Sequence, residues 1–209
     1  MLELISLEFY LITSVIYLLS AVVVFLVSCF AIKAYKMTEN RAHLLLFFSF
    51  FILGLSLISL SGISIFIYAN LKLYKSSPVN INLISYQGFM AYYIFSSLSY
   101  VLLTLIYLPK KFKLKLPVLY VPLWYANFEN FHIFSLILVG YIIIRSVINS
   151  IKRRNLDSYL VTFAFVSFFT FHLLLLLTPF TQTIYISANA FLILGSLSLL
   201  WMLVRVNRK

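Results

Sequence analysis

The stretch Leu116–Asn130 reads LPVLYVPLWYANFEN, and whether it crosses a membrane decides the topology of the whole chain. It is apolar and aromatic, but it is short for a transmembrane helix and contains Pro117 and Pro122. Crossing a bilayer takes about 20 consecutive apolar residues, and longer apolar runs on either side therefore predict six other membrane-spanning helices. These runs cover residues 6–34, 42–71, 83–108, 131–151, 158–178 and 183–206.

The composition fits a membrane protein without a soluble domain. Of the 209 residues, 63% are hydrophobic and 10% are charged, whereas about a quarter of the residues of a soluble domain are charged. Spanning helices and short connections use nearly the whole chain. We therefore expect one transmembrane domain over residues 1–209, and no enzymatic activity.

The distribution of basic residues indicates that residues 116–130 do cross. With six helices, Lys and Arg would be divided 7 inside and 8 outside, but a seventh crossing changes the division to 13 inside and 2 outside, with Arg145 left within a helix. Because cytoplasmic ends are enriched in Lys and Arg, the sequence predicts an all-α bundle of seven helices in the cell membrane. Its N-terminus lies outside, its C-terminus lies inside, and residues 116–130 form a short fourth helix. Since the basic residues lie at the ends of apolar runs, we expect the bilayer, and no nucleic acid, as the partner of the +11 charge.

An internal similarity supports a 3+1+3 layout. A displacement of 118 residues places FFSFF at 47–51 over FVSFF at 165–169, and one of 99 residues places SSLS at 96–99 over GSLS at 195–198. Residues 6–108 and 131–206 then form two parallel three-helix repeats joined by the short helix 116–130. Parallel repeats of this kind occur in membrane transporters.

Two histidines are the candidate cofactor ligands. His132 lies near the start of the predicted fifth helix, and His172 lies six residues before the outer end of the sixth. Two imidazoles on adjacent helices can ligate one haem iron from opposite sides, and either can hydrogen-bond a quinone. The sequence therefore offers His132 and His172 as a site for haem b or quinone. The lone cysteine, Cys29, lies in an apolar run and indicates no metal site.

Other polar residues are expected near the same outer leaflet. They form a candidate ligand or proton site that comprises Glu129, Asn127, Gln87 and Asn189. Glu129 has two interpretations: a carboxylate that suits the dipole of a helix N-terminus, or a proton acceptor beside His132. The last helix has no central lysine of the kind that a retinal Schiff base needs, so rhodopsin photochemistry is not expected.

The segments AYKMTENR at 34–41, FHLL at 171–174 and LVRV at 203–206 resemble uncharacterised seven-helix membrane proteins of archaea. Some of these look like sensor modules, so the resemblance implies a seven-helix fold without an agreed activity. The 3+1+3 layout is also similar to sugar transporters of the SWEET class. The proline-glutamine motif of that family is absent from the corresponding helices.

Three functional hypotheses follow. The leading one is a non-enzymatic subunit or anchor of a larger membrane complex, with other membrane subunits as partners and electron transfer through haem or quinone at the two histidines. The first alternative is a small-solute transporter whose cavity is lined by Ser56, Ser97, Asn189 and Gln87. The second is a sensor module that passes a signal to a partner on its basic inner face.

Overall fold

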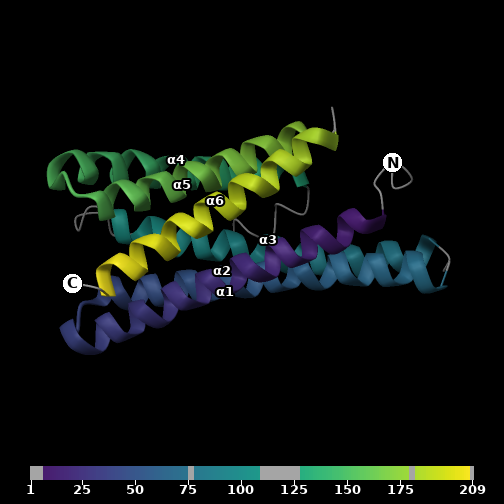
Figure 1. Cartoon of the computed structure of the whole chain (residues 1–209), viewed down its shortest axis with the longest axis horizontal. Helices are drawn as coiled ribbons and strands as arrows, with labels where there is room; N and C mark the ends of the chain where they lie inside the picture. Colours follow the sequence, from purple (N-terminus) through teal and green to yellow (C-terminus); the bar gives the residue numbers. More distant parts are fainter. Residues whose placement is uncertain (1–6, 75–77, 109–127, 179–181, 208–209) are drawn as a thin grey trace.

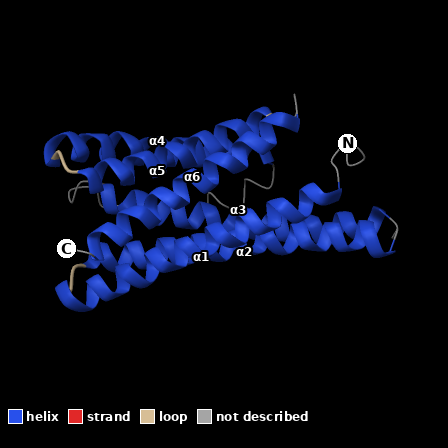
Figure 2. Ribbon diagram, in the orientation of Figure 1, coloured by secondary structure: helices blue, strands red, loops and turns tan. Residues whose placement is uncertain are grey.

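The computed structural model describes residues 7–74, 78–108, 128–178 and 182–207, and within these ranges the regular structure is entirely helical (Figure 1, Figure 2). The helices are α1 (Leu7–Thr38), α2 (Arg41–Ala69), the π-helix η2 (Asn70–Tyr74), α3 (Pro78–Tyr107), α4 (Phe128–Arg153), α5 (Leu156–Leu177) and α6 (Gln182–Asn207). The six α-helices in the described ranges are long and apolar enough to cross a membrane. The all-helical, multi-pass character predicted from the sequence is confirmed.

The predicted short helix falls mostly outside the described residues. Only its last three positions, Phe128–Asn130, are described, and they form the first turn of α4. The helix that was expected to begin at residue 131 therefore begins at Phe128. An acidic side chain in a first turn interacts favourably with the helix dipole, which explains why polar Glu129 does not delay the helix.

Two hairpins at the same end of the bundle are built alike. α1 ends at Thr38, the next residue, Glu39, has a φ of 52° in the left-handed region, and the side chain of Asn40 accepts a hydrogen bond from Ala42 N at the start of α2. Between α4 and α5, Arg154 has a φ of 47° and the side chain of Asn155 accepts from Ser158 N. In both hairpins one residue with a positive φ follows the first helix, and the next residue is an Asn that caps the second helix. The two halves of the chain thus share a turn chemistry.

Side-chain contacts fix the directions of the helices. The helices α1 and α2 are antiparallel, and Ser14 of α1 contacts Ser61 of α2. The helices α4 and α5 are also antiparallel, because His132 contacts His172 near one end of the pair and Ser146 contacts Thr162 near the other. By contrast, α3 and α4 are parallel. Tyr93 stacks on Phe131 near one end, and the Tyr141 hydroxyl donates to Tyr107 O further along both helices. The halves α1–α3 and α4–α6 therefore run in the same sequence of directions (Figure 1).

The six described α-helices form a closed ring. Each packs against its neighbours in the chain, and α1 packs against α6 to complete the circle. In Figure 1, α1 and α2 lie along the lower edge and α4 and α5 along the upper edge. The start of α1 and the end of α6 lie at opposite ends of the bundle (Figure 1).

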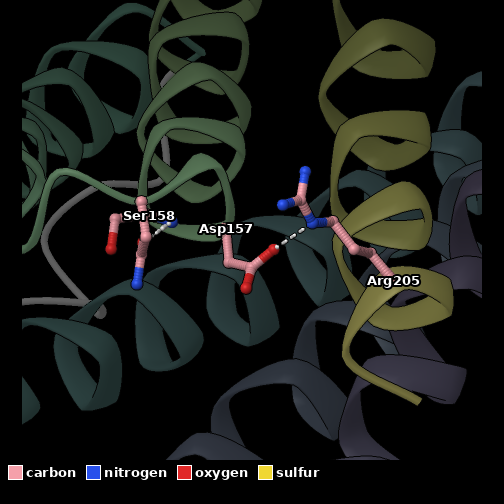
Figure 3. A network of polar contacts seen from close by, with 4 residues as sticks. Asp157, Ser158 and Arg205 are labelled. Atoms are coloured by element: carbon pink, nitrogen blue, oxygen red, sulfur yellow. Dashed lines mark hydrogen bonds and ion pairs between the residues drawn. The ribbon is translucent and has the colours of Figure 1, made fainter. Parts of the chain in front are cut away.

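An ion pair joins α5 and α6 at the end of the bundle that holds the two capped hairpins. Arg205 Nε, near the end of α6, lies 3.1 Å from Asp157 Oδ1 in the first turn of α5 (Figure 3). Asp157 is also favourably placed for the dipole of α5. The pair fastens α5 to α6 at the rim and leaves the interior of the ring to uncharged groups.

Candidate functional site

Three buried side chains from three helices form one hydrogen-bonded chain. The Nδ1 atoms of His132 on α4 and His172 on α5 lie 2.9 Å apart, and His172 Nε2 lies 2.8 Å from the Tyr100 hydroxyl on α3. His132 is 1% exposed and His172 is 0% exposed. Because α3 and α5 are not neighbours in the ring, the contact between Tyr100 and His172 crosses its interior.

Aromatic rings enclose this chain. Phe131 contacts both imidazoles, with ring centroids 4.8 Å from His132 and 5.7 Å from His172, and it stacks on Tyr93 at 4.5 Å. Phe171 covers His172 from its own helix at 5.1 Å. Burial of an unpaired charge in such surroundings is costly. The resting histidines are therefore uncharged, and one of the two facing Nδ1 atoms carries the hydrogen that the other accepts.

The arrangement does not fit a haem between the two histidines. A haem iron held by both histidines would lie between their coordinating nitrogens. Metals bind imidazole nitrogen at about 2 Å, so the two nitrogens would be about 4 Å apart. Instead, the two Nδ1 atoms are in direct hydrogen-bond contact. His172 also has no free nitrogen for a hydrogen bond to a quinone, because its Nε2 is bonded to Tyr100 and its Nδ1 to His132. The sequence predicts His132 at the outer end of its helix, closer to the membrane surface than His172. Because α4 begins one turn earlier, the two rings lie at the same depth.

Asn189 on α6 occupies a second polar position between the halves. It is 1% exposed, its side-chain Nδ2 donates to Tyr185 O at 2.9 Å, and its Oδ1 is buried without a hydrogen-bond partner among the described residues. The Tyr185 hydroxyl lies 2.8 Å from that of Tyr17 on α1. Asn189 thus lies one helical turn from a contact that joins α1 to α6.

The remaining sequence candidates are dispersed. Glu129 and Gln87 are exposed, on α4 and α3, and Asn127 lies outside the described residues. Ser56 and Ser97 are buried, and the Ser56 hydroxyl donates to Leu53 O within its own helix. The structure therefore brings His132 and His172 together, buries Asn189 separately, and does not gather Gln87 or Glu129 with them.

Sequence reasoning missed the tyrosines and several serines. Tyr100 completes the histidine chain, and Tyr17 and Tyr185 form the hydroxyl pair beside Asn189. Buried serine hydroxyls without a partner among the described residues belong to Ser20, Ser85, Ser96, Ser99, Ser135 and Ser196. A signal was present in α3, where polar groups at Tyr92, Ser96 and Ser99 recur at helical spacing on one buried face.

No protein family model, no curated protein and no solved structure matches the chain.

Proposed function

We propose that the protein is a carrier for a small uncharged polar solute, which binds between the halves α1–α3 and α4–α6. The observation that carries this proposal is Asn189 Oδ1, an acceptor buried at the boundary between the halves without a partner among the described residues. A buried acceptor without a partner costs about 1–3 kcal/mol, and a hydroxyl or amide N–H of a solute would remove that cost.

The parallel halves support the same function. α1–α3 and α4–α6 have matching directions and similar capped hairpins, as in carriers built from parallel repeats. The contacts between Tyr17 and Tyr185 and between Tyr100 and His172 link the two halves through hydroxyl groups. Such contacts can be exchanged for solute contacts when the halves rock against each other. Their lack of charge suits an uncharged solute.

We also infer that the chain crosses the membrane between α3 and α4, within the segment 116–130 that the sequence predicts, which gives seven crossings. Tyr107, at the end of α3, lies beside Tyr141. Tyr141 is thirteen residues along α4 from Phe128, which is about 20 Å at 1.5 Å per residue. The end of α3 therefore lies about 20 Å along the bundle from the start of α4. Most of the described basic residues gather at the end with the capped hairpins, where Lys36, Arg41, Lys152, Arg153 and Arg154 lie, whereas Lys72 lies at the other end. This asymmetry favours a cytoplasmic position for that end and an outside N-terminus.

The topology can be tested with single cysteines in a Cys29→Ser background. We expect a membrane-impermeant maleimide to label Glu129→Cys in intact cells, because Glu129 is exposed at the proposed outer end. Lys111→Cys should be labelled only after permeabilisation, and Glu39→Cys serves as a second inner position. Labelling of Lys111→Cys and Glu129→Cys from the same side would contradict a crossing between them.

The carrier function can be tested with the purified protein in liposomes and a panel of radiolabelled glycerol, neutral sugars and neutral amino acids. We expect uptake of at least one of these solutes above that of protein-free liposomes. Asn189→Leu should reduce this uptake about tenfold, which corresponds to about 1.4 kcal/mol of lost binding. Gln87→Leu is the matched control, because it removes an amide from an exposed position on α3 and should leave uptake unchanged.

Equal effects of the two amide substitutions would argue against a site at Asn189. If the panel shows no uptake and the protein co-purifies in a fixed ratio with other membrane chains, the carrier is rejected in favour of a subunit of a larger complex.

A further inference from the structure

We propose that Tyr100, His172 and His132 form a proton relay that carries protons from the outer end of the bundle into its interior. This activity goes beyond the carrier function, because it needs neither a solute nor Asn189. Each of the three groups can both donate and accept a hydrogen bond. The two contacts between them, 2.8 and 2.9 Å long, are within the range over which a proton is exchanged.

The relay runs along the bundle axis as well as across it. His132 is in the second turn of α4, next to Phe131, which is level with Tyr93 of α3. Tyr100 is seven residues further along α3, so its backbone lies about 9 Å deeper than that of His132 at 1.5 Å per residue. His132 is therefore the entrance and Tyr100 is the inner end.

One proton can pass without leaving a charge behind. At the start, His132 Nδ1–H donates to His172 Nδ1, His172 Nε2–H donates to the Tyr100 oxygen, and His132 Nε2 has a free lone pair. When a proton binds there, the Nδ1 proton of His132 moves to His172, the Nε2 proton of His172 moves to Tyr100, and the original hydroxyl proton of Tyr100 leaves. One proton enters, one leaves, and every hydrogen bond is reversed. Rotation returns the Tyr100 hydroxyl to its first direction, and each imidazole returns to its first tautomer by exchanging its N–H proton with water, because ring rotation does not move a proton between the two nitrogens.

The surroundings of the relay favour transfer over storage of a proton. The groups in contact with its imidazoles are Phe128, Phe131, Phe171 and Tyr100, none of which carries a charge. Tyr92 and Tyr93 of α3 are titratable groups in contact with Phe131, which itself contacts both imidazoles. Glu129, one turn before His132, is exposed at the outer end. Because these described contacts supply no carboxylate to hold the charge, an imidazolium formed in the relay passes its excess proton onward.

Further buried hydroxyl groups lie along this path: Ser99 directly precedes Tyr100 on α3, and Ser135 is about one turn after His132 on α4. Ser99 on α3, Ser135 on α4 and Ser196 on α6 are buried without partners among the described residues. At the inner end, Thr162 is hydrogen-bonded to both Ser146 and Ser150. Serine and threonine hydroxyls donate and accept, and bridging waters bound to such groups extend the path toward the inner surface.

Proton flux into liposomes tests the relay. The protein is reconstituted with the pH-sensitive dye pyranine in the lumen, and a potassium gradient with valinomycin drives protons inward. We expect acidification several-fold faster than in protein-free liposomes. His172→Asn and His132→Asn should reduce the rate to that of protein-free liposomes, because an amide can hydrogen-bond but does not accept one proton while releasing another. Tyr100→Phe, which removes only the hydroxyl, should do the same.

Two control variants separate the relay from a general loss of structure. Tyr141→Phe makes the same change in a part-buried tyrosine outside the relay, whose hydroxyl donates to Tyr107 O, and His43→Asn makes the same change near the start of α2. Both should retain the flux of the unchanged protein. Gel filtration and thermal unfolding in detergent show whether each variant is folded. If the histidine variants do not fold, the proton flux of Tyr100→Phe tests the relay.

The relay is overturned if the unchanged protein conducts no faster than protein-free liposomes, or if folded Tyr100→Phe conducts normally. Asn189→Leu should keep its proton flux. Failure of the carrier proposal would therefore leave this result intact, and failure of the relay would leave solute uptake intact.

Discussion

Phe131→Ala is expected to lower the free energy of unfolding by about 3 kcal/mol. The side chain is 0% exposed, and its ring centroid lies within 5.2 Å of those of Tyr92, Tyr93 and His132. It therefore joins α4 to α3 at the point where the halves meet. Inside a bilayer, burial from water contributes little to helix association, so the loss comes from van der Waals contacts around the cavity left behind. Unfolding by sodium dodecyl sulfate in mixed micelles would measure it.

Phe128→Ala is the matched control for this experiment. Phe128 is on the same helix one turn earlier and also contacts His132, with ring centroids 4.4 Å apart, but it is 37% exposed. Its replacement leaves an open surface instead of a closed cavity, and we expect a loss below about 1 kcal/mol. Similar losses for the two variants would mean that Phe131 is not a packing centre between the halves.

The helices could be predicted from the sequence because apolar length is a local property. The six long apolar runs correspond to the six described α-helices. The polar breaks at Asn40 and Asn155 correspond to the turns in which these two residues cap α2 and α5. The polar residues Glu129 and Asn130 predict a turn before residue 131, but α4 begins at Phe128 and includes both of them. In a first helical turn, the free N–H groups and the dipole accept such residues readily.

The site was less predictable because it depends on rotational positions that the sequence does not specify. His132 and His172 were paired by depth, but whether a ligand or a hydrogen bond lies between them depends on how far apart α4 and α5 pack. Tyr100 could not be selected from fifteen tyrosines, since a belt at the membrane interface explains most of them equally well. Its role requires a contact between α3 and α5, which are not adjacent in the ring.

Close packing of α5 against α6 depends on Gly195. A Cβ atom at this position would lie 2.8 Å from Phe168 Cε1 and 3.1 Å from the backbone oxygen of Ala164. Phe168 is 2% exposed and Ala164 is 0% exposed, so neither has space to move away. Gly195→Leu is therefore expected to cost about 2 kcal/mol through overpacking, measured by the same detergent titration. Because Phe168 lies one turn before His172 on α5, the variant should also reduce proton flux.

Gly62 on α2 provides the opposite case. It is exposed, and no atom lies within 4 Å of an added Cβ, so alanine fits there without displacement. Gly62→Ala should stabilise the protein by about 0.5–1 kcal/mol, because alanine loses less backbone entropy on forming a helix. A gain at Gly62 together with a loss at Gly195 would show that small residues at the α5–α6 contact serve helix approach. Losses of equal size at both positions would instead mean that glycine is needed for flexibility along the helices, and the close approach of α5 and α6 would not explain Gly195.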